Sequence, residues 1–416
     1  VRGAYFVCAD IELAPQTAKK WHLVAEVAQD IASVTDQLYF IENTNDIPAQ
    51  LELGVKNGTD NLLNIVAQAD GLQHTADENN KARHFANVLF NTMRGGIYSD
   101  DYAINGTFFR KHVQHFNVKC AEKHQRFLMS IPEKVDYNVL KQLVENQQDA
   151  NLMRLFLEYL PLTFSRRHGD PSRPWNAFNI NIKDENGDKL LSYQGNWRDI
   201  FQNWEALSLS YPEFINGIIA KFLNATTADG YNPYKMTNEG IEWEVIEPEN
   251  PWSNIGYWGD HQIIYLLKLM EVSQKHYPEL LASWLNKEMF AYANIPYRLK
   301  SYAEIVQNPK DSIRFDAEMN VEIEKLEKTY GSDARLILNA NGEVMLVSFT
   351  EKLMATLLAK LSNFIPEAGI WMNTLRPEWN DANNALVGTG ASMVTLYYIR
   401  RFVAFAQGLY TDAKQE

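Results

Sequence analysis

Apolar residues recur at helical spacing along most of the chain from about residue 55 onward. The strongest stripe lies in residues 136–160, where apolar side chains three or four positions apart share one face. The stretch 389–408 is apolar on most sides, as expected of an inner helix in a layered α-structure. Helices are predicted over residues 59–69, 80–94, 106–129, 136–160, 196–207, 212–224, 255–275, 279–287, 313–330, 350–364 and 389–408.

Strand-like alternation is confined to short segments. Residues 1–27 alternate on either side of a turn at Pro15, which predicts the last hairpin of a β-sandwich that begins upstream, and residues 28–42 predict a helix leading away from it. The pairs Asn186-Gly187 and Asn341-Gly342 each separate two apolar runs, which is a strong signal for a β-hairpin. The chain is therefore predicted to be mainly α, with small β-hairpin insertions and an N-terminal β-strand remnant.

The helical part contains no Gly/Ser-rich or Pro-rich linker. About a dozen helices in one unbroken domain favour helix pairs that close on themselves, an α/α toroid, over a stack of two-helix repeats, for which no short sequence period exists. We predict the tail of an N-terminal β-sandwich in residues 1–27, a linker helix and connection in 28–54, and a catalytic barrel in 55–416.

Composition narrows the class of function. The 416 residues carry a net charge of −13, with a pI near 5.3, and such a surface repels nucleic acid and anionic lipid. No apolar run reaches the ~18–20 residues that span a bilayer. The two cysteines, Cys8 and Cys120, lie in no disulfide framework or Cys/His metal spacing, so we expect no metal site. The chain starts at Val1 within a strand pattern, so we expect the numbering to begin inside a longer or processed protein, which acts in the cytoplasm.

Aromatic residues are abundant, with ten Trp, twenty Tyr and twenty Phe, and many stand beside amides and charged groups. Aromatic faces stack on sugar rings while polar neighbours bind the hydroxyls, which predicts a carbohydrate site. Taken singly, most of these aromatics are expected to be ordinary core residues. Five such segments interrupt the helical pattern: Asn91–Gly96, Ser165–Asn176, Gln194–Glu205, Pro251–His261 and Arg376–Asn384.

The segment Arg376–Asn384 contains the residue types expected around the general acid of a glycosidase. Glu378 and Asp381 are three residues apart and share a face if a helix has begun, and Trp379 between them can form an apolar wall. Such a wall raises a carboxyl pKa enough for it to protonate a leaving oxygen. The alternative, equally weighted, is that Asp381 or Asn380 caps the following helix.

Asp260 is the leading candidate for a second carboxylate if the reaction is hydrolysis. It follows Trp258-Gly259, where glycine permits a tight turn or a close approach to a ligand, and it can equally be the N-cap of the next helix. His261 can bind a hydroxyl or a phosphate, or can be a structural histidine.

The remaining candidates bind substrate. Trp197, Arg198 and Asp199 lie at the start of the helix predicted over 196–207, and Glu205 lies near its end. Structural roles are favoured for Asp199 and Glu205 over sugar binding. Arg166, Arg167, His168 and Arg173 form a local excess of cations that can receive a phosphate or pair with acidic loops, and Asp170 and Trp175 lie among them. Arg94, before Gly95-Gly96, resembles a helix C-terminal stop with a weaker role in the site.

The segment Glu378-Trp379-Asn380-Asp381 resembles the Asp-Trp-Asn-Asp acid motif of the cellobiose phosphorylase family, within the α/α-toroid glycoside hydrolases and phosphorylases. Trp197-Arg198-Asp199 followed by Gln202 looks like the Arg-Asp-x-x-Gln segment that lines the sugar subsite of that family. The resemblance implies a β-sandwich, a linker helix and a six-hairpin (α/α)6 barrel, with Asp381 as general acid. Only Gly388–Ser392 is a candidate for the C-terminal phosphate-binding residues of the family, so phosphorolysis and hydrolysis both stay open.

We therefore predict an enzyme that cleaves a glycosidic bond of an oligosaccharide with inversion, with no cofactor other than inorganic phosphate if the reaction is phosphorolysis. In that version arginines or His168 hold the phosphate. In hydrolysis Asp260, Asp199 or Glu205 activates water at roughly 6.5–9.5 Å from the acid. Alternatives are a non-catalytic sugar-binding toroid, and a lyase or isomerase that uses Tyr257 or His261. The residues expected to stack on sugars are Trp175, Trp197, Trp258 and Trp379.

Overall fold

The structure is a computed structural model. It describes residues 8–25, 29–165, 184, 190–233, 235–243, 245, 249, 262–309, 311–373 and 389–413. The chain divides into two compact units, Val1–Ile65 and Val66–Glu416, which are described separately below. Our predicted boundary at residue 55 falls inside helix α2, and the division into sandwich tail, linker and barrel stays a prediction.

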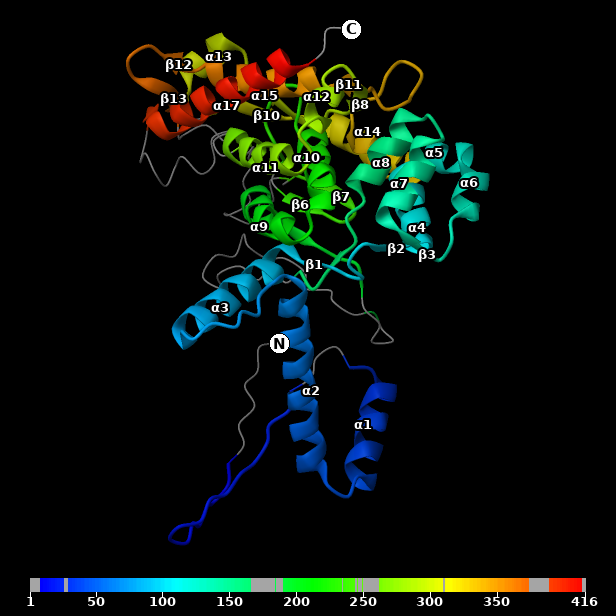
Figure 1. Cartoon of the computed structure of the whole chain (residues 1–416), viewed down its shortest axis with the longest axis vertical. Helices are drawn as coiled ribbons and strands as arrows, with labels where there is room; N and C mark the ends of the chain where they lie inside the picture. Colours follow the sequence, from blue (N-terminus) through cyan, green and yellow to red (C-terminus); the bar gives the residue numbers. More distant parts are fainter. Residues whose placement is uncertain are drawn as a thin grey trace. The chain divides into compact units, whose positions relative to one another are not determined.

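The first unit is built around helix α1 (Ile31–Asn43) and most of helix α2 (Ile47–Gln68), drawn in blue in Figure 1. Asp30 caps α1 because its carboxylate accepts a hydrogen bond from the Ser33 amide at 2.8 Å, so the helix predicted over residues 28–42 is confirmed with a slightly later start. The predicted turn near Pro15 is present, with the Thr17 amide donating to the Ala14 carbonyl. Residues 8–25 contain no assigned strand, however, so the β-sandwich tail stays a prediction.

The second unit is mainly helical. Its helices are α3 (Glu78–Gly95), α4 (Gly106–Phe116), α5 (Val118–Lys123), α6 (Gln125–Ser130), α7 (Tyr137–Glu145), α8 (Ala150–Glu158), α9 (Trp197–Ser210), α10 (Ile215–Asn224), α11 (Gln262–His276), α12 (Leu280–Trp284), α13 (Tyr302–Gln307), α14 (Ala317–Tyr330), α15 (Phe349–Leu361) and α17 (Met393–Asp412), with 3-10 turns η2 (Pro212–Phe214) and η3 (Ser332–Arg335).

Two helices predicted as single long stretches are broken in the structure. Residues 106–129 form α4, α5 and most of α6, because the side chain of Asn117 accepts a hydrogen bond from the Cys120 amide at 2.9 Å and starts a new helix. Residues 136–160 form α7 and α8, because Gln148 has a φ of 51° and Asp149 then caps α8 through the Leu152 amide at 2.8 Å. The apolar stripe continues across both breaks, which is why periodicity alone did not reveal them.

Strands occur only in small antiparallel sheets within the described residues. The pairs are β1 (Ile97–Tyr98) with β4 (Leu162–Thr163), β2 (Ala103–Asn105) with β3 (Lys134–Asp136), β8 (Glu288–Phe290) with β11 (Val347–Ser348), and β9 (Tyr297–Leu299) with β10 (Ile313–Phe315). The three-stranded sheets are β5 (Gln194–Asn196), β6 (Lys235–Thr237) and β7 (Gly240–Glu242), and β12 (Phe364–Ile365), β13 (Gly369–Asn373) and β14 (Thr389–Ser392).

The predicted hairpin at Asn341-Gly342 is confirmed. Leu338 and Val344 form an antiparallel bridge, and Gly342 adopts a φ of +69°, which suits glycine in a tight turn. The hairpin predicted at Asn186-Gly187 lies outside the described residues. The predicted fold class, mainly α with small β insertions, is confirmed and is consistent with an α/α toroid.

Helix α10 is the inner helix of the second unit. All of its residues are buried, and it packs between α8 and α11 near the centre of that unit in Figure 1. The helix predicted over 389–408 begins at Met393, after β14, and the prediction that it is an inner helix is wrong. Helix α17 packs on α11 with one face, while Val394 and Tyr397 on another face are about 60% exposed. An all-round apolar sequence therefore did not distinguish a covered helix from a surface helix.

Candidate functional site

Most of the residues expected in the active site lie outside the described residues. This holds for the three catalytic candidates and for most of the substrate-binding ones: Asp381, Asp260, Glu378, Arg167, His168, Asp170, Trp175, Trp258, His261, Trp379 and Asn380. For Trp197, Arg198 and Asp199 the structure describes the backbone, which forms the first turn of α9 as predicted. Arg94 and Glu205 are described in full.

Arg94 lies where three of the predicted segments meet. Its carbonyl accepts a hydrogen bond from the Ser165 hydroxyl at 3.0 Å, and the neighbouring Gly95 carbonyl accepts one from the indole of Trp204 at 2.8 Å. The Arg94 guanidinium stacks on the ring of Phe90, 4.1 Å from its centroid. Gly96 ends the helix at a φ of +85°, which confirms the helix stop predicted here. The end of α3, residue 165 and helix α9 are thus adjacent.

Glu205 forms an ion pair. Each of its carboxylate oxygens lies 3.1 Å from Nζ of Lys268, so the pair links α9 to α11. Both side chains are about one-third exposed. This ion pair is compatible with the structural role favoured for Glu205.

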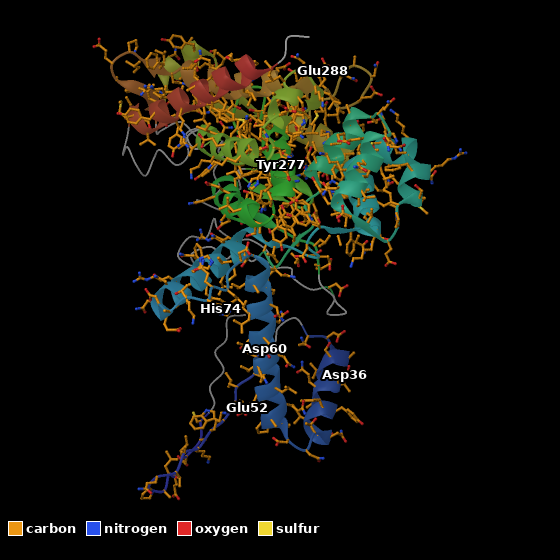
Figure 2. The ribbon with its side chains drawn as sticks, viewed as in Figure 1. Asp36, Glu52, Asp60, His74, Tyr277 and Glu288 are labelled. Carbon is orange, nitrogen blue, oxygen red and sulfur yellow. The ribbon has the colours of Figure 1, made fainter. Side chains whose placement is uncertain are left out.

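A cavity of about 550 Å³ lies between two groups of helices in the second unit. One wall comes from α7 and α8, with Tyr137, and the other from η2 and the α11–α12 region, with Glu213, Tyr277 and Trp284. Glu288 of β8 lies at the same cavity, and Figure 2 labels it together with Tyr277. Three aromatic rings beside several carboxylates are the mixture that sugar sites use.

The carboxylate of Glu213 is one of the acidic groups that line this cavity. Oε2 of Glu213 is buried and has no hydrogen-bond partner among the described residues, although the carboxylate also accepts a bond from the Tyr102 hydroxyl. Burial raises the pKa of Tyr102, Tyr137 and Tyr277, so all three stay protonated phenols.

None of these cavity residues was singled out by the sequence. Tyr137 and Trp284 lie within the predicted helices 136–160 and 279–287, and Tyr277 lies between two predicted helices, so none of them belonged to the five polar, aromatic segments. Their grouping depends on tertiary packing of segments that are distant in sequence, and no local signal could have revealed it.

A buried ionic network lies beside the cavity wall. Arg154 is fully buried, bonds Glu158 at 2.9 Å and contacts Asp333, and the side-chain amide of Asn117 donates to Asp333 at 2.8 Å. Burial raises the pKa of Asp333, and Arg154 opposes that rise. Lys221 is also buried near this network, and burial lowers its pKa to about 8. The sequence signal that could have revealed this network is the i,i+4 spacing of Arg154 and Glu158 within an apolar stripe.

Cys120, His124 and Asp149 form a third cluster. One ligand atom from each lies within 4.8 Å of the other two, so the three groups could hold a metal ion. We expected no metal site because the two cysteines show no metal-ligand spacing. Asp149 precedes α8 and is distant from Cys120 in sequence, so the spacing of the cysteines could not reveal this cluster.

Comparison with known proteins gives one match. Residues 98–161 match a family model described as glycoside hydrolase family 149 insertion domain 1. No curated protein matches the chain. The matched segment contains the α7–α8 wall of the cavity, the buried arginine and the Cys120 cluster. The match supports a relationship to a carbohydrate-active glycoside hydrolase family and does not single out the cellobiose phosphorylase family. In the described part of the chain, no helix combines the length and apolar character that a membrane span needs.

Proposed function

We propose that the chain belongs to an enzyme that cleaves a glycosidic bond of an oligosaccharide with inversion at the anomeric carbon, and that Asp381 is its general acid. The observation that carries the proposal is the match of residues 98–161 to an insertion domain of a glycoside hydrolase family. The segment Glu378–Asp381, with its resemblance to the acid motif of the cellobiose phosphorylases, supplies the residue. A neutral sugar suits a chain with a net charge of −13 better than nucleic acid or a membrane does, and we propose action in the cytoplasm.

In this mechanism Asp381 protonates the leaving oxygen while a nucleophile attacks the opposite face of the sugar. In phosphorolysis the nucleophile is inorganic phosphate, bound by Arg167 and His168. In hydrolysis it is water activated by a second carboxylate. The ion pair of Glu205 with Lys268 favours Asp260 or Asp199 over Glu205 for that role.

The test is product analysis on a panel of oligosaccharides, in phosphate buffer and in phosphate-free buffer. Release of a sugar phosphate indicates phosphorolysis, and release of free sugar alone indicates hydrolysis. NMR of the first product reports the anomeric configuration, and inversion is expected.

The variant Asp381→Asn is expected to lower kcat by at least about 1,000-fold, because an amide cannot supply the proton. Asp311→Asn is the matched control, since Asp311 is an exposed member of a surface ion pair with Lys300. Full activity of Asp381→Asn, or equal loss in both variants, contradicts the assignment of the acid.

A second candidate is a sugar-binding protein without catalysis, which the aromatic cavity favours. Calorimetric titration separates the two functions. Binding of an oligosaccharide by the unmodified chain without turnover in either buffer supports the binding protein, whereas binding that persists in Asp381→Asn while turnover is lost supports the enzyme.

A further inference from the structure

The junction between α5 and α6 approaches the start of α8 at three side chains with metal-binding chemistry. Cys120 is on α5, His124 is the residue between α5 and α6, and Asp149 precedes α8. Cys120 and His124 are less than a tenth exposed, and Nε2 of His124 lies 3.0 Å from Oδ2 of Asp149. The candidate ligand atoms of all three residues fall within 4.8 Å of one another.

Hydrogen bonds to the ends of the helices hold these groups in place. The Cys120 amide donates to the side chain of Asn117 at 2.9 Å, which fixes the first turn of α5. Oδ1 of Asp149 accepts from the Leu152 amide at 2.8 Å, so its other oxygen is directed toward His124. Such secondary contacts orient the ligands of a metal before it binds.

We propose that Cys120, His124 and Asp149 form a Zn²⁺ site, with Sγ, Nε2 and Oδ2 as three ligands and a fourth position for water. A set of one sulfur, one nitrogen and one oxygen suits Zn²⁺, whereas Mg²⁺ and Ca²⁺ prefer oxygen ligands throughout. On binding, the Cys120 thiol loses its proton to solvent and its thiolate forms the Zn–S bond. The thiolate and the Asp149 carboxylate together neutralise the ion. This proposal does not depend on the proposed glycosidase function.

Lys123 is the present cation at the site. Its Nζ lies 2.6 Å from Oδ2 of Asp149, and its side chain is 68% exposed. Because the side chain is mostly in water, it can leave the carboxylate at little cost when a divalent ion arrives. Asp149 also lines the 550 Å³ cavity, so the carboxylate side of the site borders that cavity. The metal would join the α5–α6 junction to the first turn of α8, within residues 98–161.

Co²⁺ is the probe, because a thiolate ligand gives it an ultraviolet charge-transfer band. The full chain, stripped with a chelator and kept reduced, is titrated with Co²⁺ and then with Zn²⁺. We expect one equivalent of Co²⁺ to produce the band and Zn²⁺ to remove it. Cys120→Ser is expected to abolish the band, and Cys8→Ser, at the exposed second cysteine, to leave it unchanged.

Two further variants test the other ligands. Asp149→Asn keeps a capping side chain but should weaken Co²⁺ binding by more than about 100-fold, beyond the ~10–100-fold cost of losing an outer contact. Lys123→Met should tighten binding, because it removes the competing ammonium. Circular dichroism of the metal-free variants verifies that they fold. The proposal is overturned if the unmodified chain gives no stoichiometric band, if the band survives in Cys120→Ser, if it is lost in Cys8→Ser, or if Asp149→Asn binds Co²⁺ with unchanged affinity. In that case the three residues form only a structural Lys123–Asp149–His124 network.

Discussion

The substitution Asp333→Leu tests the buried ionic network. Asp333 is 1% exposed, contacts Arg154 and accepts a hydrogen bond from the Asn117 amide at 2.8 Å. Leucine has a similar volume, so it fills the space but leaves the guanidinium with one carboxylate, that of Glu158, and leaves an amide donor unpaired. Removal of one partner from a buried ion pair costs about 3–5 kcal/mol, because the remaining charge stays desolvated.

This cost can be converted into a melting temperature. An unfolding entropy of about 2.1 cal/mol/K per residue gives roughly 0.7 kcal/mol/K for a unit the size of Val66–Glu416. The expected decrease in Tm is therefore about 4–7 °C. Thermal unfolding followed by far-UV circular dichroism at pH 7 measures it, with urea titration as a second estimate of the free energy of unfolding.

Asp311→Leu is the matched control. Asp311 pairs with Lys300 at 2.5 Å, but its side chain is 57% exposed, and surface pairs contribute only about 0–1 kcal/mol. We expect a decrease in Tm of less than about 2 °C. If Asp333→Leu costs less than about 1 kcal/mol, or no more than Asp311→Leu, then desolvation does not dominate this network and the reasoning is refuted.

Three further predictions follow from the same structure. Burial lowers the pKa of Lys221 from 10.5 to about 8, so between these pH values the unfolded chain binds more protons and the free energy of unfolding rises with pH. In Lys221→Met about 3 kcal/mol of that rise should vanish from urea titrations made across this pH range, and an unchanged pH dependence would contradict the burial argument. Gly331→Ala should cost about 2–4 kcal/mol, because its φ is +96° and a Cβ would lie 2.5–2.6 Å from the last two carbonyl oxygens of α4. Gly342→Ala, where a Cβ meets only the end of the Lys119 side chain at 3.4 Å, should cost about 1–2 kcal/mol; equal costs would exclude the steric explanation. Tyr277→Ala should weaken oligosaccharide binding about tenfold in calorimetry, with Tyr302→Ala, 84% exposed and away from the cavity, as the control; identical affinities in the two variants would show that the cavity does not bind the sugar.

Local patterns predicted the local structure. The helical stripe of residues 136–160 and the hairpin at Asn341-Gly342 are present because each depends on residues that are neighbours in sequence. The break at Asp149 was missed because a capping side chain competes with helix propagation without disturbing the apolar period. The exposure of α17 was missed because an apolar sequence does not state which of its faces a neighbour covers.

The site was less predictable, for a physical reason. The helix stop at Arg94 is a local feature, and the structure contains it. The cavity brings together Tyr137, Glu213 and Tyr277, whose sequence separation exceeds the range of any periodic pattern. The carboxylate that completes the Cys120 and His124 cluster also comes from a separate helix. The acid segment around Asp381 rests on its composition and resemblance, and it stays a prediction.

The pairing of Arg154 with Asp333 also has a consequence for synthesis. The two residues are 179 positions apart, so Arg154 leaves the ribosome well before its partner is made. At about 5–20 residues per second, this interval lasts roughly 9–36 s. During that time Arg154 and Glu158 of α8 lack the Asp333 carboxylate, so burying their charges costs more free energy than in the finished fold. The packing of α8 is therefore expected to stay open to water or to be held by a chaperone. Completion of this wall therefore waits until the segment around Asp333 is synthesised, although residues 98–161 are made before it.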